Sequence, residues 1–192
     1  MIYHDLIVVG GGPAGLALAS AAYDTGVTDT LILEKEASLG GRLRPDSAEP
    51  YGKCGIKVFK KEMTAEEYLR RFLRLLEIYE VPFQVSASVS EIRMQDKAGH
   101  FLLECRTADG STEMMECRAL ALATGSNADV RFPSVKVSAE DGKPEINKYF
   151  GTSIQGLYAV GDFLRMHSLP DEASEEGAMA GRSIAEYLKH RS

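Results

Sequence analysis

Short apolar runs alternate with a glycine-rich turn and a helical stretch at the start of the chain. Residues 6–9 are a continuous apolar run, which is typical of a parallel strand buried on both faces. Residues 14–22 are rich in alanine and leucine and predict a helix, with Gly26 as its C-cap. A second apolar run, residues 30–33, ends at Glu34. Strand, helix and strand in this order predict an α/β fold with a parallel sheet.

The middle of the chain has a different pattern. Thr64 and Glu67 have the spacing of a capping box, which predicts the start of a helix. The apolar face of this helix is expected at Leu69, Phe72, Leu73 and Leu76. Its solvated face is expected at Arg70, Arg71 and Arg74. Residues 81–117 hold short alternating runs, separated by turn residues at 98–99 and 109–110, and predict an antiparallel β-meander.

Small residues dominate one face of a last predicted helix. The residues at helical spacing are Ala173, Gly177, Ala180, Gly181, Ile184, Ala185 and Leu188. Small residues near its start let the helix end approach a flat ligand closely. The alternative is that they only allow tight packing on the sheet.

Composition excludes several classes of protein. The chain has 192 residues, of which 44% are hydrophobic and 26% charged, as in a globular domain. A net charge of −6 without a basic block argues against nucleic acid or an anionic membrane as the main partner. No apolar run approaches the roughly 18 residues of a membrane span, and the N-terminus lacks the basic region of a signal peptide. We therefore expect a soluble cytoplasmic protein.

The first apolar run leads into a G-x-G-x-x-G motif. Gly10 permits the tight turn, Gly12 lets a diphosphate approach the backbone, and Gly15 lets helix and strand pack closely. Free N–H groups at the start of the helix, with its positive dipole end, favour a diphosphate. Glu34 follows the motif at the distance, about 20 residues, where a carboxylate can accept both hydroxyls of an adenosine ribose. The unit predicts a dinucleotide site.

Three further segments favour FAD over NAD. Residues 34–43 contain an acidic residue followed by Gly40-Gly41-Arg42, residues 119–125 end in Ala-Thr-Gly, and residues 156–162 end in Gly161-Asp162. Together with the glycine motif, these segments resemble the FAD-binding domain of the two-dinucleotide-binding-domain flavoproteins, the pyridine nucleotide-disulfide oxidoreductase superfamily, and thioredoxin reductases in particular. The resemblance covers residues 4–125 and 143–190. The alternative, a plain NAD-binding Rossmann domain, would not explain the Gly40-Gly41 pair or Gly161-Asp162.

The resemblance implies a Rossmann-like, three-layer α/β FAD-binding domain with the meander in its crossover. It also implies a cofactor site formed by Gly10, Gly12, Pro13, Ala14, Gly15, Glu34, Lys35, Gly41, Arg42, Leu43, Val89, Ala123, Thr124, Gly125, Gly161, Asp162, Glu172 and Ala173. In that family the Gly-Asp carboxylate bonds the ribityl chain, and the next helix points its N-terminus at the flavin. Arg42 is expected to contact the diphosphate. The family usually has Gln-Ala where this chain has Glu172-Ala173, and we expect Glu172 to face elsewhere.

The cysteines and histidines give no strong catalytic signal. The disulfide reductases of the superfamily use closely spaced cysteine pairs, which this chain lacks, so we do not expect disulfide reductase activity. Cys105 and Cys117 are expected as small hydrophobic residues in strands. Cys54, between Lys53 and Lys57, is the candidate reactive thiol if its setting is accessible and electropositive. His167 is expected in a surface loop, the alternative being a proton donor at the flavin edge.

No histidine or cysteine has the spacing of a metal site, so we expect no bound metal ion.

The nicotinamide domain of thioredoxin reductases would be inserted between the Ala-Thr-Gly strand and the second FAD motif. Here only the segment 126–155 separates Gly125 from Gly156, and it is too short for such a domain. We therefore expect a single FAD-binding domain over residues 1–192, with 126–142 as a bridge and simple strands and turns at 130–137 and 142–149.

The expected function is that of a minimal FAD-dependent oxidoreductase. Its electrons would come from transiently docked NAD(P)H, from a partner redox protein or from a small-molecule substrate. The alternative is a non-catalytic FAD-binding protein: a sensor, a carrier or a subunit of a larger complex. An exposed flavin face also favours a homodimer or a covering partner.

Overall fold

The central feature of the fold is a seven-stranded mixed sheet in the order β5-β2-β1-β8-β7-β6, with β9 also paired to β8. The structure is a computed structural model and describes residues 2–48, 50–95, 100–126, 135–140 and 142–190. The strands are β1 (Ile2–Val9), β2 (Thr30–Leu33), β5 (Phe83–Gln84), β6 (Ser88–Met94), β7 (Phe101–Arg106), β8 (Thr112–Leu122) and β9 (Leu157–Ala159). The pairs of β1 with β2 and β8, of β2 with β5 and of β8 with β9 are parallel. The β6–β7–β8 meander is antiparallel.

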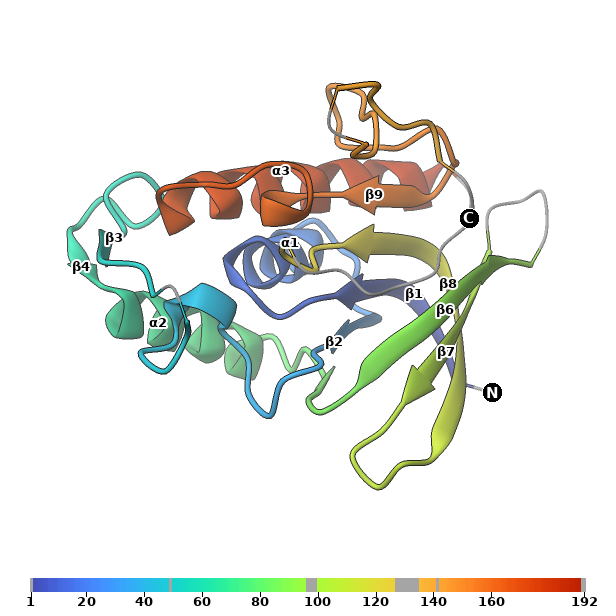
Figure 1. Ribbon diagram of the computed structural model, residues 1–192, viewed down its shortest axis with the longest axis horizontal. Coiled ribbons are helices and arrows are strands. Elements are labelled where there is room, and N and C mark those ends of the chain that lie inside the picture. Colours follow the sequence, from blue (N-terminus) through green and yellow to red (C-terminus); the bar gives the residue numbers. More distant parts are fainter. Residues whose placement is uncertain (1, 49, 96–99, 127–134, 141, 191–192) are drawn as a thin grey trace.

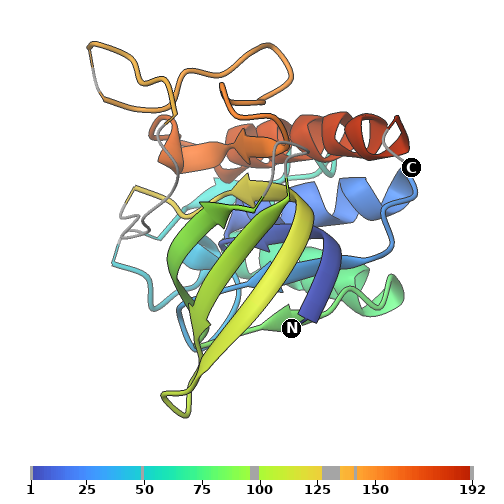
Figure 2. The same cartoon turned by 90° about the vertical axis from the view of Figure 1, so that its right-hand side faces the viewer.

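Alternating residues of β1 divide the core into two parts, one on each face of the sheet. Leu6 and Val8 pack with helices α1 (Pro13–Asp24), α2 (Ala65–Ile78) and α3 (Pro170–Lys189). Ile7 and Val9 pack with the meander. Figure 1 shows the helices on one side of the central strands and the meander on the other, and Figure 2 shows the meander in front of the helices. The predicted three-layer Rossmann-like architecture is confirmed.

The register of the parallel strands aligns their carboxyl ends. Val9 of β1 pairs with Leu33 of β2 and with Leu122 of β8, and Leu122 also pairs with Ala159 of β9. The segments that follow these strands therefore leave the sheet at one edge. They are the glycine-rich turn, the segment at Glu34, residues 123–125, and the 3-10 helix η2 (Gly161–Phe163). In open α/β sheets this edge is where ligands bind.

Several expected elements differ in detail. β5 lies within the region predicted as meander, but it pairs in parallel with β2 and extends the Rossmann sheet. On α2, Leu73 is 37% exposed and Tyr68 is fully buried instead, because the buried stripe runs through Ala65, Tyr68, Phe72 and Leu76. The capping box at Thr64 and Glu67 is confirmed.

The expected strands of the bridge are not formed where the structure describes it. Residues 127–134 lie outside the described residues. In the described parts of the bridge and the segment after it, residues 135–140 and 142–149, there is an isolated antiparallel bridge between Val137 and Pro144 in place of strands. No helix within the described ranges is long and apolar enough to cross a membrane.

Candidate cofactor site

A cavity of about 720 Å³ lies at the carboxyl edge of the parallel strands. This volume is typical of a small-molecule or cofactor site. Most of the predicted cofactor residues line it: Gly10, Gly12, Pro13, Ala14, Glu34, Lys35, Gly41, Arg42, Val89, Ala123, Thr124, Gly125, Asp162 and Ala173. Residues that were not predicted from the sequence line it as well, among them Arg44, Asp46, Tyr51, Ser88 and Met166.

Four predicted residues lie outside the cavity lining: Gly15, Leu43, Gly161 and Glu172. A Cβ on Gly15 would lie 1.9 Å from the carbonyl oxygen of Gly10, so Gly15 has the predicted role of close helix–strand packing. Leu43 is fully buried in the core, and the Gly161 amide donates to Glu176 at 3.2 Å. Glu172 faces Lys57, 3.6 Å away, as expected for a carboxylate turned from the site.

The glycine-rich turn leaves open space where the diphosphate is expected. A Cβ on Gly12 would meet no atom within 4 Å. Gly41 begins the 3-10 helix η1 (Gly41–Leu43) with a φ of +51°, and a Cβ there would lie 3.2 Å from Gly12 Cα. Gly12 is also the N-cap of α1 and carries no side-chain cap. The first N–H groups of α1 are therefore available to an anionic ligand.

Glu34 forms one end of the cavity. It is 6% exposed, and its carboxylate accepts from the Gly11 amide at 2.7 Å and from the Glu36 amide at 2.9 Å. Each oxygen keeps a second lone pair for a hydroxyl donor. Because Glu34 follows β2 and Asp162 follows β9, the strand order places them on opposite sides of the glycine-rich turn that follows β1. The cavity thus suits a long ligand with two different ends and an anionic centre.

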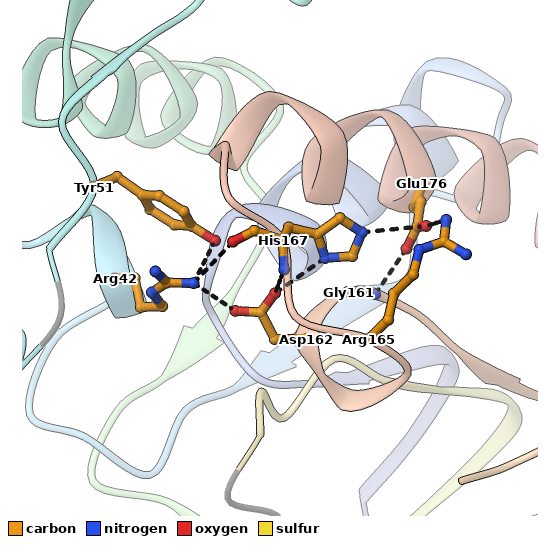
Figure 3. Close-up of polar contacts among 7 residues, drawn as sticks. All are labelled: Arg42, Tyr51, Gly161, Asp162, Arg165, His167 and Glu176. Atoms are coloured by element: carbon orange, nitrogen blue, oxygen red, sulfur yellow. Dashed lines mark hydrogen bonds and ion pairs between the residues drawn. The ribbon is translucent and has the colours of Figure 1, made fainter. Parts of the chain in front are cut away.

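The Asp162 end of the cavity contains Arg42 and Tyr51. Arg42 Nη1 donates to Asp162 Oδ2 at 3.2 Å, to the Tyr51 hydroxyl at 3.2 Å and to the His167 carbonyl at 3.1 Å (Figure 3). Its guanidinium also lies over the Tyr51 ring, 4.1 Å from the centroid. Burial, and next the charge of Asp162, raise the pKa of Tyr51 to about 12. The predicted contact of Arg42 with the diphosphate stays a prediction, and in the structure its guanidinium contacts Asp162.

His167 is 6% exposed, so the expectation of a surface-loop histidine is wrong. Its Nδ1 lies 3.0 Å from Asp162 Oδ1, and its Nε2 lies 3.3 Å from Glu176 Oε1. Glu176 is also paired with Arg165 (Figure 3). The hydrogen bonds to Asp162 and Glu176 raise the pKa of His167 to about 9. His167 lies behind Asp162 and does not line the cavity, so this geometry does not support a proton donor at the ring edge.

The burial of Glu176 was not predicted, although its position on the small-residue face of the last helix indicates it. It lies on the same helical face as Ala173, Gly177 and Ala180, which are all buried. A carboxylate on such a stripe requires a buried partner. Burial opposes the ionisation of Glu176, but His167 and Arg165 outweigh it and lower its pKa.

Cys54 does not have the setting that a reactive thiol needs. It is 2% exposed in the short strand β3 (Lys53–Cys54), which pairs with β4 (Met63–Thr64). Burial, and next the charge of Asp171, raise the pKa of its thiol to about 11. Lys53 is paired with Glu62, and Lys57 with Glu172 and Glu175. The hypothesis of an accessible, electropositive Cys54 is therefore wrong.

The other two cysteines lie in strands as expected. Cys105 and Cys117 are fully buried in β7 and β8, and all three cysteines are free.

In native protein at pH 8, Cys54 should react with a thiol-specific reagent at least about 100-fold more slowly than in urea-unfolded protein, because burial removes both access and thiolate. The measurement is labelling kinetics followed by peptide mapping. Rapid modification of Cys54 in the folded protein would contradict this prediction.

No group of three or more metal-binding side chains occurs among the residues that the structure describes.

The sequence matches the pyridine nucleotide-disulphide oxidoreductase family over residues 6–180. Two curated relatives are the mitochondrial dihydrolipoyl dehydrogenase of Dictyostelium discoideum and the probable indole-3-pyruvate monooxygenase YUCCA9 of Arabidopsis thaliana. The first is 25% identical over 177 residues, covering 90% of this chain and 32% of the relative. The second is 29% identical over 140 residues, covering 67% of this chain and 33% of the relative. The chain thus spans about a third of the length of these relatives.

Solved structures of thioredoxin reductases share the fold. A ferredoxin-flavin thioredoxin reductase from Clostridium acetobutylicum superposes with a TM-score of 0.78 at 15% identity, covering 99% of each chain. A thioredoxin reductase from Gloeobacter violaceus gives 0.74 at 15% identity, covering 100% of this chain and 97% of that one. The family match and the fold support the same assignment, and the family implies FAD binding. The chain belongs to the pyridine nucleotide-disulphide oxidoreductase family, in which it corresponds to the FAD-binding domain.

Proposed function

We propose that the chain binds FAD in the cavity at the carboxyl edge of the sheet and acts as an oxidoreductase through that cofactor. The observation that carries this proposal is the order of groups along the cavity: the Glu34 carboxylate, the uncapped start of α1 beside Gly12 and Gly41, then Asp162 and Arg42. Bound FAD supplies a ring that accepts and releases electron pairs.

Each part of the cavity has a proposed task. Glu34 accepts hydrogen bonds from the adenosine ribose, and the backbone near Val89 contacts the adenine. The N–H groups at the start of α1 hold the diphosphate. Asp162 accepts from the ribityl chain, and the start of α3 near Ala173 lies against the ring. Glycines at positions 12 and 41 leave the space that the diphosphate needs.

The source of electrons is proposed to lie outside this domain. The segment 126–155, between Gly125 and Gly156, is too short for an inserted nicotinamide-binding domain. Residues 1–192 form one FAD-binding domain in this proposal, with 126–142 as a bridge. Electrons then reach the flavin from transiently docked NAD(P)H, from a partner protein or from a reducing substrate, and a partner or second copy covers the ring. Thiol–disulfide exchange within the chain is not part of the proposal, because all three cysteines are buried and free.

An anaerobic absorption spectrum of the purified protein, before and after NADPH and then NADH, tests the proposal. A flavin band that one nucleotide bleaches supports a self-sufficient reductase. A band that bleaches only with a partner or substrate supports an external donor. A band that persists with every donor contradicts the oxidoreductase function, and failure to bind FAD when it is added contradicts the proposal as a whole.

Replacing Glu34 by glutamine should weaken FAD binding about 10- to 100-fold, since hydrogen bonds to a charged group contribute about 1.5–3 kcal/mol each. Titration of apoprotein with FAD, followed by quenching of flavin fluorescence, measures the effect. Glu77→Gln, on the exposed face of α2, is the matched control and should change affinity less than twofold. Equal affinities for the two variants would mean that Glu34 does not hold the ribose.

A further inference from the structure

The guanidinium of Arg42 is held beside Asp162 in the cavity. Its partners include Asp162, the Tyr51 hydroxyl and the His167 carbonyl, within 3.1–3.2 Å, and it stacks on the Tyr51 ring (Figure 3). Several contacts on different segments fix this position more tightly than a single surface pair would. In the proposed binding mode, this end of the cavity holds the flavin half of the cofactor.

Arg42 is the cation that the cavity presents at this end. Three described cationic side chains line the cavity: Lys35, Arg42 and Arg44. Lys35 is adjacent to Glu34 at the opposite end. Arg44 donates hydrogen bonds to Ser38 and forms an ion pair with Asp46. His167 and Arg165 lie behind Asp162 and do not line the cavity. Arginine also stays charged at every pH at which the protein is folded.

A fixed positive charge here distinguishes the two redox states of the flavin. Two electrons and one proton convert the neutral oxidised ring into the anionic reduced ring, so that one negative charge appears beside Arg42. The cation stabilises the reduced form more than the oxidised form, which raises the redox potential. A diphosphate carries the same charge in both states, so a diphosphate contact would change affinity without changing potential.

We propose that Arg42 sets the redox potential of the bound flavin by holding a positive charge, paired with Asp162 and Tyr51, at the ring end of the cavity. This inference rests on the proposed binding of FAD and goes beyond it by assigning one residue to the electronics of the ring. It gives Arg42 a different role from the diphosphate contact that the sequence alone suggested, and the test below separates the two roles.

The test compares wild-type protein with Arg42→Gln and Arg42→Lys, which both lose the stacked guanidinium but differ in charge. Each is loaded with FAD, reduced anaerobically against a reference dye, and titrated for FAD affinity in the oxidised state. We expect Arg42→Gln to lower the reduced-to-oxidised ratio at a fixed potential about tenfold, equivalent to about 30 mV for a two-electron couple. Arg42→Lys should restore most of this ratio. Arg70→Gln, which removes an exposed charge on α2, should leave it unchanged.

A second variant should change the reduced-to-oxidised ratio in the opposite direction. Asp162→Asn removes the counter-charge of Arg42, so it should raise the reduced-to-oxidised ratio even where it weakens FAD binding, and it keeps the test decisive if Arg42→Gln folds poorly. Weaker FAD binding by Arg42→Gln with an unchanged potential would overturn the inference in favour of a diphosphate contact. Equal potentials for the Gln and Lys variants would also overturn it. Wild-type protein that takes up no FAD would instead contradict the proposed function.

Discussion

Replacing Gly177 by valine is expected to lower the free energy of unfolding by about 3 kcal/mol, at the upper end of the usual cost of overpacking a core. α1 and α3 cross backbone to backbone at this point: a Cβ on Gly177 would lie 2.1 Å from the Ala14 carbonyl oxygen and 2.9 Å from the Ala14 carbonyl carbon. The clash is with main chain, which cannot rotate away as a side chain can. Urea unfolding followed by circular dichroism measures the change.

The same substitution should also abolish FAD binding, because Ala14 and Pro13 line the cavity at the start of α1. Any separation of α1 from α3 moves the amides that are proposed to hold the diphosphate. Met179→Ala, on the same helix but 48% exposed, is the control and should change stability by less than about 0.5 kcal/mol. A valine at position 177 that costs no more than this control would show that the two helices adjust freely.

The crossing of α1 and α3 shows what the sequence predicts well. The small residues at 173, 177, 180 and 181 left two interpretations open: approach to a flat ligand, or tight packing. The structure assigns Gly177 and Gly181 to packing, since Cβ atoms there would meet the α1 backbone at 2.1 and 2.4 Å. Ala173 lines the cavity. Periodicity identified the face of the helix, but it could not say which small residue meets protein and which faces the cavity.

Motifs that are local in the chain predicted their surroundings best. The glycine-rich turn, Glu34, residues 123–125 and Asp162 each follow a strand closely, so their placement at one edge depends only on strand order. Gly15 could be assigned to packing because the spacing of its motif fixes the contact with Gly10.

Contacts between distant segments could not be predicted in this way. Arg42 and Asp162, which are in contact, are 120 positions apart in the chain. The buried carboxylate of Asp171 accepts hydrogen bonds from backbone amides more than 110 positions earlier, those of Gly55, Lys57 and Val58. No local pattern specifies which loop a side chain meets. The expectations for Cys54 and His167 were wrong because both were judged from their immediate sequence neighbours, which do not show that both side chains are buried in the fold.

The stability of the protein should fall by on the order of 3 kcal/mol between pH 6.5 and pH 9 through His167 alone, at about 1.4 kcal/mol per pKa unit. The hydrogen bonds to Asp162 and Glu176 raise its pKa from 6.5 to about 9 in the folded protein. Folding therefore favours the protonated form. The stabilisation is fully present below pH 6.5 and is lost as the pH rises through about 9. Urea unfolding at intervals across this range measures the slope.

The loss of stability between pH 6.5 and pH 9 follows from how the two carboxylates are held. Glu176 is buried and Asp162 partly buried, and hydrogen bonds and charges from His167, Arg42 and Arg165 keep their pKa values low. Once the imidazole is neutral, two negative charges share this site with one partly buried and one exposed arginine. His167→Gln should therefore flatten the pH profile and lower stability mainly below pH 8. His190→Gln, at the exposed end of α3, should keep the wild-type slope. A His167→Gln profile as steep as wild type would assign the pH dependence to other groups, and the charge balance at the Asp162 end would then not depend on this histidine.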